Sequence, residues 1–281
     1  MLSRLTEITV VIFAAGTLSA GSYAGAPGHD ETASTAENLQ QISESAVATT
    51  TIDSVTTPAN EVTITPINSF RIDYAARYAA FKADATLELR AAKTANEYVY
   101  EVTTTARGLA RLIQSGTAVE SSRFAITSAG LQPAQYTYED GSRDEDKASS
   151  IAFDWSQLIG HSVHEGVAAE LKLQPGLLDR LTADLQSILE LRAGQTPTSQ
   201  NIAYKNSIRQ YDLKLLGEED VTVPAGTFNA LKFYRQRPGS RRATLIWFAA
   251  DAGYLPVRIE LLKNDKTTIT MVATSLSPAA G

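Results

Sequence analysis

The clearest structural signal in this chain is the stretch of residues 221–232, which reads VTVPAGTFNALK. Within it, Pro224-Ala225-Gly226 separates the short run 221–223 from the run 228–232. Proline and glycine between two short runs of this kind are typical of a turn that joins antiparallel strands. The stretch therefore predicts a β-hairpin.

Upstream of this hairpin, apolar and polar residues alternate with a period of two in residues 83–90, 98–103 and 211–215. Such alternation is typical of antiparallel strands that bury one face. Glu139-Asp140-Gly141-Ser142 supplies a further turn sequence. These patterns predict a mainly β fold of roughly 10 to 12 strands.

One segment departs from the period of two. It is preceded by Pro175-Gly176 and followed by Gly194, which is placed to end a helix. Its residues with helical spacing are Leu178, Leu181, Leu185, Ile188, Leu189 and Arg192. The spacing predicts one amphipathic helix that packs across a sheet face or plugs one end of the sheet.

Residues 245–248, Leu-Ile-Trp-Phe, form a strand that is apolar on both faces. Its second face must be covered either by the helix and the curvature of the sheet, or by an apolar ligand in a half-open barrel. Trp247 and Phe248, together with Trp155, are therefore candidate ligand-binding residues. The alternative is that they are aromatic residues of the core or of the barrel rim.

Four arginines, Arg235, Arg237, Arg241 and Arg242, flank the turn sequence Pro238-Gly239-Ser240. Guanidinium groups suit phosphate and carboxylate, so this turn is the best polar candidate site. A solvated loop whose charges neutralise nearby acids is the alternative.

The N-terminus predicts export. Residues 1–24 combine Arg4 with a short apolar run and small residues before an expected cleavage after Ala24, which is typical of a signal peptide; an uncleaved anchor is the alternative. Residues 25–66 are expected to form a disordered acidic linker, a spacer or a docking tail, and residues 67–281 a single β domain. No transmembrane segment is expected after cleavage.

Composition excludes several classes of function. The net charge is −6, and residues 27–66 hold six acidic side chains but no Lys or Arg, which argues against a nucleic-acid partner. There is no cysteine, no nucleophile elbow and no phosphate-binding glycine loop. We therefore expect no catalytic residues, no metal site and no cofactor.

The C-terminal block resembles the signature of the DUF3108 family of uncharacterised bacterial periplasmic proteins. The resemblance lies in the PAGTF hairpin at 224–228, the strand with Trp247, and GYLPVRI at 253–259. Weaker similarity covers the chain from about Phe70 to Leu276. The resemblance implies a curved antiparallel sheet or half-open β-barrel, and a periplasmic location in a Gram-negative bacterium. It supplies no catalytic residues.

Together these observations predict a non-enzymatic protein that binds an apolar or lipid-like ligand, or an envelope partner, in its curved sheet. A structural envelope protein with a filled barrel and no ligand is one alternative. A cell-wall hydrolase is the other.

Overall fold

The alternating stretches form long antiparallel strands in the computed structural model, which describes residues 67–112, 116–128, 130–142 and 148–277. In the strands Phe70–Tyr78 and Phe81–Ala91, every second residue is buried along most of the strand. The signal peptide and acidic linker predicted for residues 1–66 lie outside the described residues.

The elements follow one another along the chain with short connections. The first half contains β1 (Phe70–Tyr78), β2 (Phe81–Ala91), β3 (Glu97–Arg107), the 3-10 helix η2 (Gly108–Leu112), β4 (Thr117–Thr127), β5 (Gly130–Glu139), β6 (Ser149–Asp154), β7 (Ile159–His164) and β8 (Val167–Lys172). The second half contains β9 (Leu178–Asp179), α2 (Arg180–Arg192), β10 (Ser199–Tyr204), β11 (Ser207–Val223), β12 (Gly226–Gln236), β13 (Arg242–Ala249), the 3-10 helix η4 (Ala250–Ala252), β14 (Leu255–Lys263) and β15 (Lys266–Ser277).

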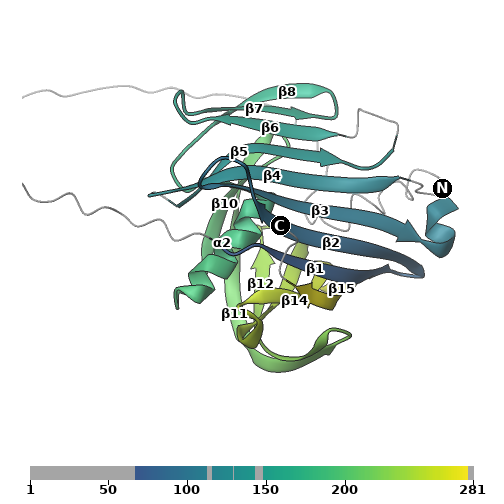
Figure 1. Cartoon of the computed structure of the whole chain (residues 1–281). Coiled ribbons are helices and arrows are strands. Elements are labelled where there is room, and N and C mark those ends of the chain that lie inside the picture. The colour runs from purple at the N-terminus through teal and green to yellow at the C-terminus, as the bar shows by residue number, and fades with distance from the viewer. Residues whose placement is uncertain (1–66, 113–115, 129, 143–147, 278–281) are drawn as a thin grey trace, which may run out of the picture. The chain divides into compact units, whose positions relative to one another are not determined.

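All of these strands belong to one mainly antiparallel sheet of fifteen strands. Its order is β8-β7-β6-β5-β4-β3-β2-β1-β15-β14-β13-β12-β11-β10-β9, so the first and last strands pair in the middle (Figure 1). The count exceeds the expected ten to twelve because β6 to β10 have six residues or fewer. Strands that short show too little alternation to be recognised separately.

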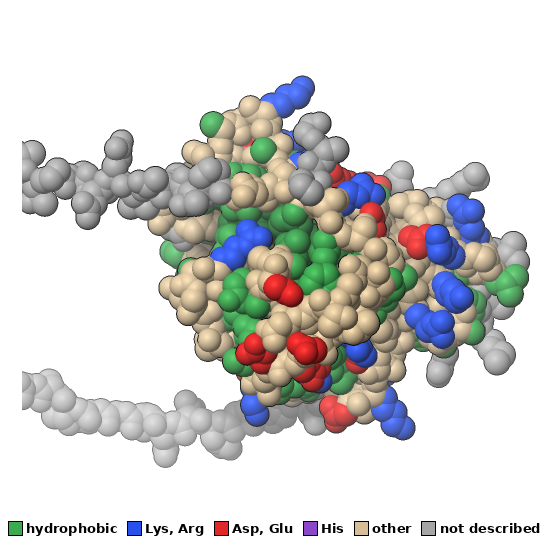
Figure 2. All heavy atoms as spheres, turned by 60° about the horizontal axis from the view of Figure 1, so that its bottom comes forward, with side chains coloured by type: hydrophobic (Ala, Val, Ile, Leu, Met, Phe, Trp, Pro, Cys, Tyr) green, Lys and Arg blue, Asp and Glu red, His purple; other side chains and the backbone are tan. Residues whose placement is uncertain are grey.

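The sheet is curved but is not closed into a barrel. Its two ends approach each other through side chains: the Ser162 hydroxyl on β7 donates to the Lys205 carbonyl at 2.7 Å, and Asn206 Nδ2 donates to the Val167 carbonyl at 2.9 Å. No backbone ladder joins β8 to β9 in the described part of the chain. Seen from below, hydrophobic side chains gather in the middle of the face, with charged groups around them (Figure 2).

The predicted helix is present as α2 and packs against one face of the sheet, which we call the inner face. Its buried side chains, including Leu181, Leu185 and Ile188, join the main core with residues of β1 to β4 and β10 to β15. The helix begins two residues later than the apolar spacing suggested, because Leu178 and Asp179 pair with β10.

The start of α2 is held by a capping box. The Asp179 carboxylate accepts the backbone N–H of Leu181 and of Thr182, both at 2.9 Å, and Thr182 Oγ1 accepts the Asp179 N–H at 2.9 Å. Ser122 on β4 donates to the same carboxylate at 2.5 Å. These contacts satisfy backbone donors that a helix start leaves unpaired, and they tie α2 to β4.

Protein atoms cover both faces of the doubly apolar strand β13. Ile246 and Phe248 face α2, and Phe248 packs edge to face against Phe233 with ring centroids 5.7 Å apart. Trp247 is only 3% exposed, since the side chains of Lys232 and Arg258 lie over its ring. Side chains of the protein itself therefore cover both faces of this strand.

Candidate functional site: a basic cleft beside the helix

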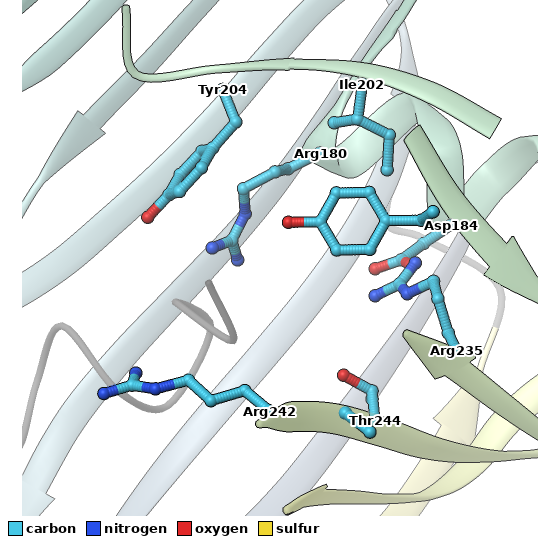
Figure 3. A pocket seen from close by; sticks show the side chains of 9 residues that line it. Arg180, Asp184, Ile202, Tyr204, Arg235, Arg242 and Thr244 are labelled. Carbon is cyan, nitrogen blue, oxygen red and sulfur yellow. The ribbon is translucent and has the colours of Figure 1, made fainter. Parts of the chain in front are cut away.

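A cleft opens on the inner face between α2 and strands β10 to β13 (Figure 3). Its lining residues are Arg180, Asp184, Ile202, Tyr204, Tyr211, Arg235, Arg242, Ala243 and Thr244. We call it the basic cleft. Its cavity volume is about 30 Å³, and about 460 Å³ when the space open to solvent is included. The cleft itself therefore holds one or two water molecules, and it opens to solvent.

A second, more apolar cavity adjoins the basic cleft and shares Arg180, Asp184, Arg235 and Thr244 with it. The rest of its wall consists of Leu87, Ile246, Phe248, Pro256, Ile259 and Leu261. Its volume is also about 30 Å³. A ligand pocket typically has roughly 300 to 1,000 Å³, so this cavity is far too small for an acyl chain.

Arg180, the first residue of α2, is held at the cleft by a buried carboxylate. Its Nε lies 3.0 Å from Glu120 Oε1 and its Nη2 lies 3.2 Å from Glu120 Oε2. The Tyr136 hydroxyl donates to Glu120 Oε1 at 2.7 Å. Burial raises the pKa of Glu120, and Arg180 and the Tyr136 hydrogen bond oppose this shift.

One helical turn further along α2, Asp184 forms an ion pair with Arg235 of β12. Both side chains are largely but not completely buried, with 23% and 16% exposed. Residues four apart share one face of a helix, so Arg180 and Asp184 present a cation and an anion to the same cleft. Asp184 is the only carboxylate among the residues that line the cleft.

Tyr204, at the end of β10, gathers three cationic groups around its ring. Arg180 Cζ lies 5.0 Å from the ring centroid, and Lys205 Nζ and Arg209 Cζ each lie 5.5 Å from it. Cations within about 6 Å of an aromatic face are attracted by its quadrupole. Burial lowers the pKa of Lys205, and nearby Arg209, Arg180 and Arg242 act in the same direction, against Glu165. Positive charge is therefore crowded on this side of the cleft.

The four arginines predicted as one polar site are divided by the structure. Arg235 and Arg242 line the basic cleft, whereas Arg237 and Arg241 lie in the connection between β12 and β13 and line neither cavity. Figure 3 shows Arg242 lying across the cleft from Arg180 and Tyr204.

The three aromatic candidates lie in separate surroundings. Phe248 contributes to the apolar cavity, but Trp247 is directed away from it and its Nε1 donates to Glu219 Oε1 at 2.6 Å. Trp155 belongs to a smaller core at the β5–β8 end of the sheet, stacked on Phe153 at 6.3 Å, and its Nε1 donates to the Pro133 carbonyl at 2.6 Å. The structure therefore does not bring these aromatic rings into one wall.

Sequence reasoning missed Arg180, Asp184 and Tyr204 as cleft residues. The first two stand on the expected helix, and their i, i+4 spacing was the available signal. Which strand they would face depends on how the sheet curls, which has no local signature in the sequence.

No cluster of three histidine or acidic side chains suited to a metal ion occurs among the described residues. In that same part of the chain, no helix is long and apolar enough to cross a membrane.

Residues 69–273 match a family model described as a protein of unknown function, DUF3108. No curated protein matches the chain. Several solved structures are similar at low identity. One is a β-barrel-like DUF1849 protein from Brucella abortus, with 8% identity, a TM-score of 0.46, and coverage of 76% of this chain and 99% of that chain.

A second is the Pseudomonas aeruginosa MucA/MucB complex, with 12% identity, a TM-score of 0.36, and coverage of 76% of this chain. This protein spans only 53% of the matched chain in that complex. A third is an exported protein with a YmcC-like fold from Bacteroides fragilis, with 9% identity, a TM-score of 0.32, and coverage of 74% of this chain and 95% of that chain.

Proposed function

Since this chain belongs to the DUF3108 family, whose function is unknown, we propose a function from its own residues: it is a non-catalytic binding protein that recognises an anionic group in the basic cleft. The anionic group belongs to a small ligand or to an envelope partner. The inner face of the curved sheet, beside α2, is the binding surface.

The observation that carries this proposal is the excess of positive charge at an open cleft. Arg180, Arg235 and Arg242 line it, and Asp184 is the one acidic side chain in its wall. A second carboxylate, Glu120, reaches Arg180 from β4. Crowded cations repel one another, and an anion that binds among them relieves this repulsion and gains charge-assisted hydrogen bonds.

The filled interior favours recognition at the surface over storage of an apolar molecule. The large side chains of α2 pack directly on the sheet, and the two cavities between α2 and strands β10 to β14 hold about 30 Å³ each. A third hollow beside Gln186 and Glu190 of α2 is larger, at about 340 Å³, and it is lined mainly by polar side chains and backbone. An acyl chain does not fit either of the two smaller cavities. A lipid-like ligand is therefore proposed to present its headgroup to the basic cleft rather than its chain to the core.

We propose a binding role rather than an enzymatic one because of how the acidic groups are used. Hydrolysis of a glycosidic bond needs two carboxylates facing one substrate. Here Glu120 is buried against Arg180 and Tyr136, and Asp184 is paired with Arg235. Both carboxylates are therefore engaged in ion pairs with arginine.

The proposed location is the periplasm, on the strength of the N-terminal sequence. An exported protein would meet anionic headgroups and acidic envelope partners there.

A photocrosslinking experiment tests the proposed function. Tyr211, which lines the cleft, is replaced by p-benzoylphenylalanine in the full chain expressed in a Gram-negative bacterium, and Tyr254, a half-buried tyrosine outside the cleft, is replaced in a matched control. We expect an adduct with an anionic species from position 211 that the additional substitution Arg242→Gln removes.

The proposal is wrong if no adduct forms at position 211, or if the adduct is uncharged or forms equally at position 254. That result would favour the scaffold alternative, in which the filled sheet has surface contacts only.

A further inference from the structure

We infer that the group recognised by the basic cleft is a phosphate-class dianion, such as a phosphate monoester, rather than a carboxylate. The inference rests on the proposed function and specifies the ligand of the same cleft. It follows from the number of uncommitted donors and from the charge around them.

The arginine donors at the cleft are only partly used. Arg180 contacts Glu120 through Nε and Nη2 and also interacts with the Tyr204 side chain. Arg235 contacts Asp184 through Nη1, which leaves Nε and Nη2. The Arg242 side chain has no ion pair with any described residue. Arg235 and Arg242 can therefore turn an N–H toward an anion in the open part of the cleft, while Arg180 contributes positive charge to its wall.

Two tyrosine hydroxyls add neutral donors. Tyr204 and Tyr211 both line the cleft. Burial raises the pKa of Tyr204, so its phenol keeps its proton at neutral pH and can donate it to an acceptor. With the arginines, the cleft wall offers more donors than the two oxygens of a carboxylate can accept. The three terminal oxygens of a phosphate monoester match this set better.

Charge is in keeping with the same ligand. Arg180, Arg235 and Arg242 line the cleft and Lys205 lies beside Tyr204, while the carboxylates near them are Glu120, Asp184 and Glu165. These groups leave the cleft positively charged. A phosphate monoester carries close to two negative charges at neutral pH and suits a site of positive charge.

Arginine also suits the geometry of the proposed group. Its planar, permanently charged fork binds phosphate and carboxylate through paired N–H donors. Arg180 already uses one such fork on Glu120, which fixes the plane of its guanidinium at the wall of the cleft. This guanidinium therefore pays little rotamer entropy when the anion binds.

A soluble phosphate ester and the phosphate of a lipid headgroup share this chemistry. The test is isothermal titration calorimetry on the full chain with glycerol 3-phosphate, inorganic phosphate and acetate, at one ionic strength. A parallel arm measures sedimentation with phosphatidylcholine vesicles that contain phosphatidic acid, against vesicles of phosphatidylcholine alone. Vesicle binding together with weak glycerol 3-phosphate binding identifies the lipid source, and the reverse identifies a soluble ester.

Matched variants locate the site. We expect Arg242→Gln to lower the affinity for the phosphate probes by about tenfold or more, as expected for the loss of a charged donor. Arg237→Gln, which removes an arginine from the same connection but outside the cleft, should change it by less than about twofold. Circular dichroism confirms that both variants are folded.

Two results overturn the inference, and they are distinct. If acetate binds as tightly as the phosphate probes, the cleft is an anion site without phosphate selectivity; the inference fails and the proposed function stands. If no probe binds, or if Arg242→Gln and Arg237→Gln behave alike, the cleft is no anion site and both fail.

Discussion

Glu120 on β4 and Arg180 at the start of α2 form a buried ion pair across 60 residues of sequence, with Arg180 Nε 3.0 Å from Glu120 Oε1. The pair joins the helix to the sheet and at the same time aims a guanidinium at the basic cleft. Stability and binding are therefore coupled at this position.

Replacing Glu120 with glutamine should destabilise the fold strongly. The change leaves the Arg180 guanidinium buried without its counter-charge, and breaking a buried pair in this way costs about 3 to 5 kcal/mol. Urea unfolding measures the effect. Glu101→Gln is the control, since the Arg90–Glu101 pair at 3.5 Å is more exposed and its loss should cost less than about 1 kcal/mol. Equal losses in the two variants would contradict the role given to Glu120.

Replacing Asp184 with asparagine should increase the affinity for glycerol 3-phosphate by roughly three- to tenfold. The carboxylate competes with the ligand for Arg235 and repels any anion in the cleft, and the change removes both effects. Calorimetry measures it, with Glu190→Gln on the same helix as the control outside the basic cleft. Weaker binding by the Asp184 variant would contradict this prediction and show that the Asp184–Arg235 pair positions Arg235 for the ligand rather than limiting its affinity.

Replacing Trp247 with phenylalanine should affect stability without affecting binding. The change removes the indole donor to Glu219 and weakens the contacts with Lys232 and Arg258, which should cost about 1 to 3 kcal/mol. The affinity for glycerol 3-phosphate should stay within about twofold, because Trp247 lines neither cavity. A large loss of affinity in a stably folded variant would show that Trp247 contributes to binding.

Asp179 should make the fold less stable as pH rises through the mildly acidic range. Burial raises the pKa of Asp179 from 3.8 to about 6, although Ser122 and Thr182 hydrogen bonds oppose the shift. Between these values the folded chain binds more protons than the unfolded chain, so stability falls with rising pH. The contribution, roughly 3 kcal/mol in total, is fully present well below pH 4 and is almost entirely lost above about pH 6.

The Asp179→Asn variant isolates this effect, since asparagine also caps helices but does not titrate. Between pH 4 and pH 7, the unfolding free energy of the wild-type protein should fall relative to that of the Asp179→Asn variant as pH rises. A difference that stays constant, or that moves in favour of the wild-type protein, would contradict the assignment.

The strands and the helix could be predicted because their signals are local. Alternation at 83–90 and the turn at Pro224-Ala225-Gly226 determine strands and hairpins within a few residues. The family assignment was likewise carried by a contiguous block and is confirmed by the match over residues 69–273. Fold class and family therefore followed from short stretches of sequence.

The site could be predicted only in part, because it depends on contacts distant in sequence. The arginine-rich turn correctly predicted Arg235 and Arg242 as site residues. No sequence feature near that turn indicates that Arg180 and Tyr204 line the same cleft. These residues meet only after α2 packs on the inner face and β10 pairs with β11. The direction of the Trp247 side chain could not be predicted either. In a strand that is apolar on both faces, the sequence does not indicate which face will be covered by a cationic side chain such as Lys232.

The central claim, that the basic cleft binds a phosphate-class anion, is tested most directly by observing the arginine side chains themselves. The measurement is nuclear magnetic resonance of the arginine Nε–Hε groups in the nitrogen-15-labelled full chain during titration with glycerol 3-phosphate. We predict saturable shifts, with one common dissociation constant, for Arg180, Arg235 and Arg242, and none for Arg237 or Arg90. Shifts that grow linearly for all exposed arginines, or no shift at the three cleft residues, would contradict the claim.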